Sequence, residues 1–466
     1  MGKLALRGGP KLRTRPFHSW PVVDEEMERL VLDVLRSGKW GRLTGATRTK
    51  QFEERFAGYV GAGFALAVST GTAALEVALV AAGVDIGDEV IVPPYTFMAG
   101  CTCVLLVGAV PVFVDIDPET YNLDPTLIEA AITDKTRAIL PVHFGGLPAD
   151  MDAITAIARK HRLLVIEDCA HAHGGIHASG KLGTLGDAGA WSFQMSKNIT
   201  SGEGGAITTS NPQLYNQAIL YHDFWRSALV RDDDEHYLPG RVNFPVLSWN
   251  YRLNEFAGAI LLRQMAFVDE WAQRRHDNAT YLTARLQEID GLSTLRTDPF
   301  VVRNAVHSYR VNYTDPAAFK GLSRATLLEA VKAEGIDVGE GYFAPVYKHP
   351  VFQNARAGAL RSGFPLTSSY YGRHMDYRET VCPAAERACA ELCIRVGGQT
   401  MFLGTRKDMD DVADAFVKVK EHVDELLRDD AAGPDGAGRP RSSAAPAAAG
   451  ARAAGPARRP PSTAAR

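Results

Sequence analysis

Residues 64–83 read FALAVSTGTAALEVALVAAG, in which a short apolar run passes through small residues into an alanine-rich segment. The run FALAV has the length and composition of a buried strand, and the alanine-rich segment ends at Gly83, as a helix commonly does. A strand that turns directly into a helix is the repeating unit of parallel α/β sheets. This stretch therefore predicts an α/β fold.

The alternation of strands and helices extends to both sides of this stretch. Further strand-like runs occupy residues 89–93, 110–116, 137–142, 163–168, 189–193 and 204–210. Further helical patterns occupy residues 24–36, 49–60, 96–108, 124–132 and 149–161. The strands are continuously apolar, which indicates a sheet that is covered by helices on both faces. We predict a mostly parallel sheet in a large domain over residues 23–253, preceded by an N-terminal segment over residues 1–22.

The pattern changes near Asn254. Residues 253–289 form a helical pattern of 37 residues without proline, which is long enough to act as a strut between two domains. A strand-like run at 307–313 and helical patterns at 323–334 and 409–427 follow it. We therefore predict that residues 254–430 contain a linking helix and a smaller α+β C-terminal domain.

The last segment, residues 431–466, consists almost entirely of Ala, Pro, Gly, Ser and Arg. Because it has no aromatic residue and no large aliphatic residue, it cannot bury enough surface to offset the entropy of ordering. We predict a disordered tail. A basic arm with a function is the alternative, since this segment holds six arginines and one aspartate.

The composition is that of a globular enzyme, with 46% hydrophobic and 23% charged residues and a formal net charge of −3. The body of the chain is acidic and offers no basic surface for nucleic acid or for an anionic membrane. No run approaches the roughly 18 apolar residues of a membrane span, and the first residues lack the apolar core of a signal peptide. We expect a cytoplasmic protein whose six cysteines are reduced thiols.

The cysteine and histidine spacings do not favour a metal site. Cys382, Cys389 and Cys393 lack a CxxC pair and a fourth ligand. His171 and His173 lie two residues apart, but no second acid–histidine set supports them. We therefore expect no metal.

Three segments at the carboxyl ends of the predicted strands can carry chemistry, because ligands of parallel α/β sheets bind at that edge. In the first, residues 69–72 open the alanine-rich helix, where backbone N–H groups and the helix dipole favour a phosphate. The alternative is an ordinary N-cap with a tight turn. The segment matches neither a Walker loop nor the GxGxxG fingerprint.

The second and third segments supply a carboxylate and an amine. Glu167 and Asp168 end the apolar run LLVIED, where a carboxylate can hold a cationic ring nitrogen, although a helix cap or surface pair is the alternative. Lys197 follows the apolar run GAWSF and precedes a glycine-rich turn. Partial desolvation would lower the pKa of this lysine and make it a nucleophile able to form a Schiff base. A phosphate cradle, a carboxylate and a lysine together meet the needs of pyridoxal phosphate.

The chain resembles the DegT/DnrJ/EryC1/StrS family of sugar aminotransferases from about Ser37 to Leu427. The motifs that carry the likeness are SGKW, STGTAALEVAL, GDEVIVPPYTFMA, PVFVDID, YNLDP, PVHFGG, VIEDCAHAHG, WSFQMSKNITSGEGGAI and NYRLNEFAGAI. The resemblance implies a pyridoxal-phosphate enzyme of fold type I.

The resemblance also implies roles for residues around the cofactor ring. Lys197 is expected to be the catalytic residue, which carries the cofactor covalently and moves the proton. Asp168 is expected to bind the pyridine nitrogen, His171 to lie near the ring hydroxyl, and Phe97 to stack on the ring.

A second group of residues is implied for the phosphate. Gly71, Thr72 and Ser192 are expected to hold the phosphate of the cofactor within the chain. Asn250 is expected to reach the phosphate that is bound to a neighbouring subunit. The resemblance therefore implies a homodimer with shared active sites.

The implied reaction is a ping-pong transamination in which glutamine or glutamate donates the amino group. The segments YNLDP, LPAD and PVYKHPVF look closest to members that act on keto-cyclitols, such as scyllo-inosose or valienone-like rings, in aminocyclitol and aminoglycoside antibiotic biosynthesis. Tyr347, Gly398 and Gln399 stand where many members have histidines, so a nucleotide-linked keto-sugar is a less favoured acceptor. Two further alternatives remain. One is an eliminating or aromatising enzyme such as 3-amino-5-hydroxybenzoate synthase. The other is a non-catalytic cofactor-binding partner or regulatory sensor, which the complete set of Lys197, Asp168 and Ser192 disfavours.

Overall fold

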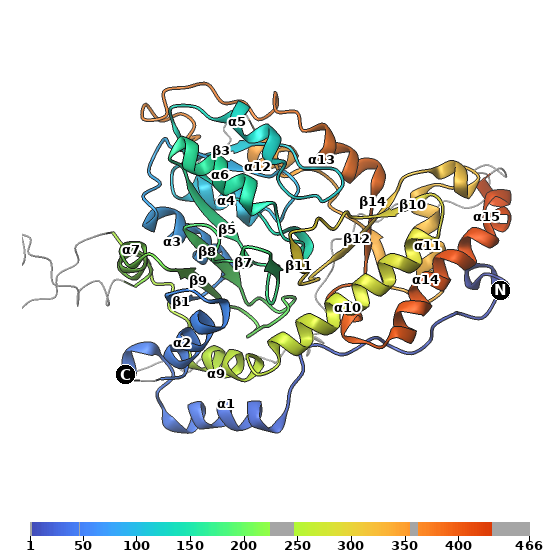
Figure 1. Cartoon of the computed structure of the whole chain (residues 1–466), viewed down its shortest axis with the longest axis horizontal. Coiled ribbons are helices and arrows are strands. Elements are labelled where there is room, and N and C mark those ends of the chain that lie inside the picture. Colours follow the sequence, from blue (N-terminus) through green and yellow to red (C-terminus); the bar gives the residue numbers. More distant parts are fainter. Residues whose placement is uncertain (1, 46, 224–246, 355–361, 431–466) are drawn as a thin grey trace, which may run out of the picture.

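The computed structural model describes residues 2–45, 47–223, 247–354 and 362–430. It has two lobes, a larger one built on a central sheet and a smaller one formed mainly by parts of the second half of the chain (Figure 1). Val346, Phe352 and Tyr377, which also belong to that half, pack in the core of the large lobe. None of the helices in these ranges is long and apolar enough to cross a membrane. The predicted tail over residues 431–466 lies outside the described residues.

A seven-stranded sheet forms the centre of the large lobe, and its strands were all anticipated from the apolar runs. Six strands run parallel and β9 alone runs antiparallel, because the loop of residues 193–204 joins β8 to β9 without a helical crossover. The prediction of a mostly parallel α/β sheet is confirmed. In spatial order the strands are β1 (Phe64–Val68), β9 (Gly205–Thr209), β8 (Ala188–Ser192), β5 (Leu164–Asp168), β4 (Thr136–Ile139), β2 (Glu89–Val92) and β3 (Val110–Phe113).

Helices cover both faces of this sheet, which explains why its strands are apolar throughout. One face packs against α3 (Gly71–Ala81), α4 (Ala99–Leu106) and α7 (Pro212–His222). The other face packs against α2 (Arg48–Val60), α6 (Met151–His161) and α9 (Glu255–Gln264). In β1 the alternation is direct, since Leu66 and Val68 face the first layer and Ala65 and Ala67 face the second.

The small lobe is an antiparallel sheet backed by helices. Its strands are β10 (Leu292–Thr294), β12 (Tyr309–Tyr313), β14 (Cys393–Val396) and β13 (Val338–Glu340), in that spatial order. The helices around its core are α10 (Val268–Gln287), α11 (Arg324–Ala333), α14 (Arg406–Glu421) and α15 (Val423–Asp430). The shorter elements of the chain are α5 (Ile128–Ala131), α12 (Pro350–Gln353), α13 (Pro383–Arg387) and a small antiparallel sheet of β11 (Val301–Arg303), β6 (Ile176–His177) and β7 (Gly180–Lys181).

The expected single helix over residues 253–289 is in fact two helices, α9 and α10, so this prediction was wrong. The chain tightens between them, where the N–H groups of Ala266 and Phe267 bond three residues back. The turn lets Phe267 stack on Trp271, with ring centroids 5.2 Å apart. No glycine or proline marks the break, so the sequence pattern could not show it. Of these two helices, α10 crosses from the large lobe to the small one and α9 stays on the large lobe (Figure 1).

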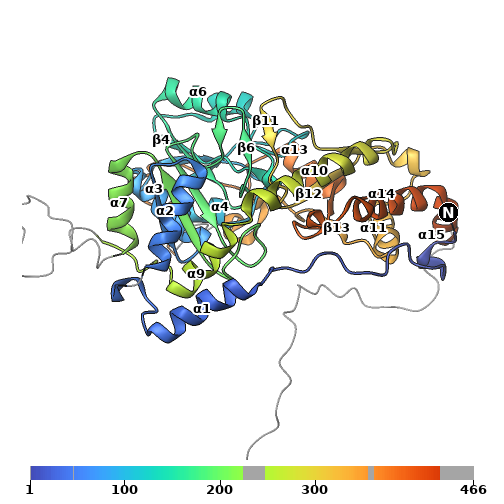
Figure 2. The same cartoon turned by 60° about the horizontal axis from the view of Figure 1, so that its bottom comes forward.

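The N-terminal residues join the two lobes along a second path. Figure 2 shows the chain starting beside α15 and running along the molecule to α1 (Glu25–Ser37), which lies on α9. Leu4 is part of the core of the small lobe. Arg13 is buried there and forms ion pairs with Asp408 at 2.7 Å and Asp411 at 2.8 Å. These contacts tie the first residues to the small lobe.

Candidate active site

A pocket of about 490 Å³ opens at the carboxyl edge of the central sheet. Its walls come from the segments that follow β1, β2, β5 and β8, and from two residues of the small lobe. Seven of the eight residues that the sequence singled out line it, namely Gly71, Thr72, Phe97, Asp168, His171, Ser192 and Lys197. The pocket therefore lies where a parallel sheet is expected to bind a ligand.

The first turn of α3 forms one wall of this pocket. Thr70 caps the helix, since its hydroxyl accepts a hydrogen bond from the N–H of Ala73 at 3.0 Å. Gly71 and Thr72 then line the pocket at the positive end of the helix dipole. A Cβ at Gly71 would lie 2.6 Å from the Cβ of Ser192, so only glycine fits this close approach between α3 and β8. The result is a small concave surface suited to an anion.

Two adjacent carboxylates at the end of β5 have different surroundings. Glu167 is fully buried and accepts three backbone N–H groups of loop 183–186 at 2.7–2.8 Å, and it also bonds to His143 at 3.0 Å. Asp168 faces the pocket instead. Burial raises the pKa of Asp168, while the N–H of Ala170 and the charge of Lys197 lower it. Glu167 is therefore a structural carboxylate, and Asp168 is the one available to a ligand.

Lys197 lies in the loop between β8 and β9, on the same edge of the sheet as Asp168. Burial lowers the pKa of Lys197 to about 8, although the carboxylate of Asp168 opposes this shift. In part of the molecules the Lys197 amine is then neutral near physiological pH, whereas an ordinary surface lysine is almost fully protonated there. A neutral amine is the nucleophilic form that a Schiff base requires.

Two histidines stack beside the lysine. The rings of His171 and His307 lie 4.1 Å apart with an interplanar angle of 21°. Burial lowers the pKa of both histidines well below the usual range, and the charge of Lys197 adds to the effect. Burial therefore favours the neutral form of both rings. The buried Nδ1 of His171 has no hydrogen-bond partner among the described residues, so it is available to a polar group of a ligand.

Phe97 and Asn250 complete the set of predicted residues. The side chain of Phe97 is 64% exposed while lining the pocket, so its ring face is free to cover a ligand. Asn250 is exposed and does not line the pocket of its own chain. Its backbone forms an isolated β-bridge with Asp223. The next residue, Tyr251, accepts a hydrogen bond from the N–H of Ser69 at 2.7 Å.

Sequence reasoning missed the two residues of the small lobe that line the pocket, His307 and Tyr342. His307 is held by its N–H, which donates to the carbonyl of Gly145 at 2.8 Å. The pattern HSYRVNY indicated only a strand, because the approach of this segment to the sheet edge depends on how the lobes pack. The histidine just before that strand was the only signal in the sequence.

The geometry fits pyridoxal phosphate. The Gly71 surface would take its phosphate, Asp168 its pyridine nitrogen, and the unpartnered Nδ1 of His171 a polar ring substituent. The described residues also place His143, Glu167 and Cys169 close enough to hold a metal ion. However, the oxygens of Glu167 already accept the hydrogen bonds of a structural centre, so this cluster does not favour a metal.

Comparison with known proteins gives consistent results. Residues 21–382 match the DegT/DnrJ/EryC1/StrS aminotransferase family. L-glutamine:scyllo-inosose aminotransferase of Streptomyces griseus is 37% identical over 440 residues, covering 91% of this chain and 99% of that protein. L-glutamine:2-deoxy-scyllo-inosose aminotransferase of Streptoalloteichus tenebrarius is 36% identical over 438 residues, with the same coverage. The crystal structure of 3-amino-5-hydroxybenzoic acid synthase has a TM-score of 0.74 at 31% identity, covering 89% of this chain and 100% of that one.

The family match includes the whole central sheet and much of the small lobe, and the relatives align along nearly their full length. The family consists of pyridoxal-phosphate-dependent transferases, which agrees with the pocket at the sheet edge. This chain belongs to the DegT/DnrJ/EryC1/StrS aminotransferase family.

Proposed function

We propose that this protein is a pyridoxal-phosphate aminotransferase that moves the amino group of glutamine or glutamate to a keto-cyclitol in the biosynthesis of an aminocyclitol antibiotic. The observation that carries the proposal is that a lysine with its pKa lowered to about 8 shares one pocket with a buried carboxylate and a helix N-terminus. These are the three groups that this cofactor needs.

The residues of the pocket divide the work of the reaction. The cofactor, when bound, supplies an electron sink that accepts the electron pair of the C–H bond broken at the α-carbon of the substrate. Asp168 would hold the pyridine nitrogen in its protonated form, and the first turn of α3 would hold the phosphate. The Nζ of Lys197 would take the α-proton of the amino donor and return a proton to the acceptor. The stacked rings of His171 and His307 would form part of the cofactor pocket, and the Nδ1 of His171 would be available to a polar ring substituent.

The acceptor class is inferred from the relatives. Two relatives that align over 91% of this chain are named for glutamine as donor and for scyllo-inosose or its 2-deoxy form as acceptor. A keto-cyclitol is neutral and carries many hydroxyl groups. It therefore needs hydrogen-bonding partners and no basic subsite for a nucleotide diphosphate.

We also propose that the active unit is a homodimer in which Asn250 completes the site of the partner. Its exposure in the single chain, beside the segment that leads to α3, supports this assignment. Lys197→Ala and Asn250→Ala proteins can be refolded together, because each mixed dimer would contain one intact site. Activity that returns on mixing supports shared sites, and two inactive proteins that stay inactive when mixed contradict them.

We propose the cytoplasm as the site of action. All six cysteines are free and buried, as expected for thiols that never meet an oxidising compartment. Fractionation of the native cells, followed by an activity assay of each fraction, tests this assignment.

The function is tested by following the two half-reactions separately. Glutamine should remove the visible absorption band of the bound cofactor, and scyllo-inosose or 2-deoxy-scyllo-inosose should restore it. Nucleotide-linked keto-sugars serve as the comparison acceptors. A band that glutamine and glutamate leave unchanged would contradict an aminotransferase.

A second candidate is an aromatising enzyme, which the similarity to 3-amino-5-hydroxybenzoic acid synthase favours. The same lysine and carboxylate could serve an elimination, so the fold does not separate the two reactions. Product analysis does separate them. An aromatising enzyme gives an ultraviolet-absorbing product from a cyclic ketone without consuming glutamine, whereas an aminotransferase consumes one donor for each amine formed.

A further inference from the structure

A second cavity, of about 580 Å³, lies beside α10 between the two lobes. We call it the α10 cavity. It is lined by residues of α10, by residues 294–297, by most residues of the segment 304–310, and by Phe144, Gly145 and Leu147. The segment 304–310 serves both cavities, because His307 lines the active-site pocket while Ser308 and Arg310 line the α10 cavity. Its volume lies in the range of small-molecule sites.

Arg310 gives the α10 cavity a positive charge that has no carboxylate counter-ion among the described residues, although its guanidinium lies over the ring of Phe144 with Cζ 5.4 Å from the centroid. Arg310 is only 7% exposed, its Nε has no hydrogen-bond partner, and no carboxylate of the described residues forms an ion pair with it. Its Nη1 donates to the hydroxyl of Ser308 at 2.5 Å. Burying a cation without a counter-ion is unfavourable, so this guanidinium would be stabilised by an anion. Arg296 differs, because Asp117 and Asp298 neutralise it at 2.6 and 2.7 Å.

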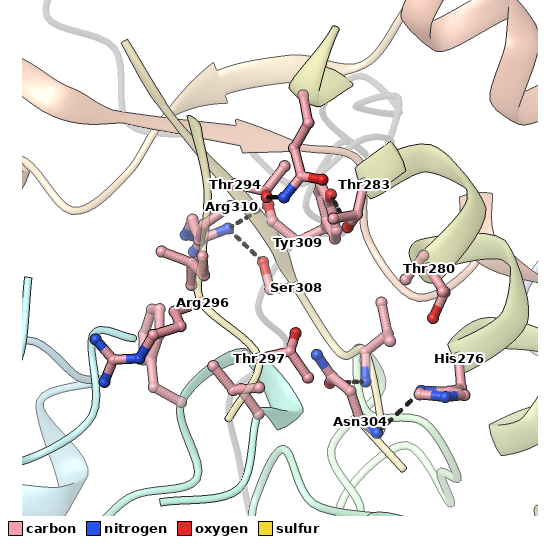
Figure 3. Close-up of a pocket in the computed structure, with 17 residues that line it drawn as sticks. His276, Thr280, Thr283, Thr294, Arg296, Thr297, Asn304, Ser308, Tyr309 and Arg310 are labelled. Carbon is pink, nitrogen blue, oxygen red and sulfur yellow. Dashed lines mark hydrogen bonds between the residues drawn. The ribbon is translucent and has the colours of Figure 1, made fainter. Parts of the chain in front are cut away.

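The rest of the wall is rich in hydroxyl groups. Figure 3 shows the hydroxyls of Thr280 and Thr297 directed into the open space, and neither bonds to another described residue. Thr283 and Thr294 are already occupied, since they bond to Tyr309 and Gln287. Free hydroxyls on opposite walls suit a ligand that both donates and accepts hydrogen bonds.

We propose that the α10 cavity binds a small polyol phosphate, with the phosphate at Arg310 and Ser308 and the polyol hydroxyls at Thr280 and Thr297. Arginine and a hydroxyl are a favourable pair for a phosphate. The lining residues include no lysine and no carboxylate, so the described walls offer an anion only the arginines and hydrogen-bond donors. This site is separate from the first turn of α3 with Gly71 and Thr72, called here the α3 cradle, which would hold the phosphate of the cofactor.

Calorimetry on the full chain, saturated with pyridoxal phosphate so that the α3 cradle is filled, tests the proposal. The probe is D-glucose 6-phosphate, with D-glucose and inorganic phosphate as the two partial ligands. The ester should bind about tenfold more tightly than either partial ligand, because only the ester uses both walls. Absence of binding, or equal binding of inorganic phosphate, would overturn the proposal.

Two variants locate the binding. Arg310→Met removes the buried positive charge. Thr280→Phe, at an exposed position of α10, fills the cavity and gives a test that does not depend on the folding of the arginine variant. Each should weaken binding of the ester by about tenfold or more. The control is Thr155→Phe on α6, whose hydroxyl donates to the carbonyl of Met151 at 2.7 Å and which does not line the cavity. Binding that survives Thr280→Phe, or an Arg310→Met protein that loses only affinity for glutamine, would place the anion elsewhere.

Discussion

The active-site pocket and the α10 cavity differ in whether a carboxylate accompanies their buried basic side chain. In the active-site pocket the amine of Lys197 shares the walls with the carboxylate of Asp168, and burial lowers the pKa of the amine to about 8. In the α10 cavity Arg310 is buried without a carboxylate partner among the described residues. The first arrangement can lose and regain a proton during a reaction, whereas the second can only attract an anion. The comparison separates a site of chemistry from a site of binding.

The largest effect is expected from Lys197→Ala. Without this amine the pocket has no nucleophile and no proton carrier, so transamination should fall by about 10⁴-fold or more. Lys160→Ala, an exposed lysine paired with Glu129, is the matched control and should keep full activity. If Lys197→Ala retained activity, the reaction would not depend on this amine, and the assignment of this pocket as the active site would be wrong.

A smaller loss is expected from Asp168→Asn, about 10²-fold in activity, because an amide cannot keep the pyridine nitrogen protonated. The same change should also alter Lys197. The carboxylate raises the pKa of the lysine, so its removal should move the pKa below the present value of about 8.

The pH dependence of the reaction between the cofactor-free protein and pyridoxal phosphate measures this shift. The rate should rise with pH as the amine of Lys197 loses its proton, and then level off above the pKa. In Asp168→Asn the rise should occur at lower pH. An unchanged pH dependence would show that the two side chains do not interact.

Gly71→Ala should weaken the binding of pyridoxal phosphate by about tenfold, since an added Cβ would force α3 away from Ser192 and disturb the phosphate cradle. Equilibrium dialysis of the cofactor measures the effect. Gly58→Ala is a suitable control, because a Cβ on that helical glycine meets nothing within 4 Å. Equal affinities of the two variants would argue against a phosphate at this turn.

The smallest effect on catalysis is expected from Glu167→Gln. This buried side chain accepts the N–H groups of loop 183–186, so the change should lower the free energy of unfolding by about 2 kcal/mol. Activity per folded molecule should change only a few-fold. Urea titration and a rate assay separate the two quantities. A large loss of activity at unchanged stability would mean that the adjacent carboxylates had been assigned the wrong way round.

Much of the fold follows from the sequence because the buried strands of a parallel sheet are short apolar runs, as at residues 64–68 and 164–168. The break between α9 and α10 did not follow, since it depends on how Phe267 packs on Trp271. The N-terminal residues gave no sign of joining the small lobe, because Leu4 and Arg13 are buried only by residues far along the chain.

The site shows the same division between local and distant information. Asp168 and Lys197 could be singled out because each follows an apolar strand, and neighbouring strands of a sheet bring their carboxyl ends together. His307 and Arg310 could not be singled out, because the packing of the two lobes alone brings the strand β12 to the sheet edge.

The central claim is that the amine of Lys197 forms a covalent bond with pyridoxal phosphate. Borohydride reduction of the protein with its cofactor, followed by peptide mapping, measures that bond directly. The expected result is one pyridoxyl group per chain, located on the peptide that contains Lys197. A label on any other lysine, or a protein that binds the cofactor without a reducible bond, would contradict it.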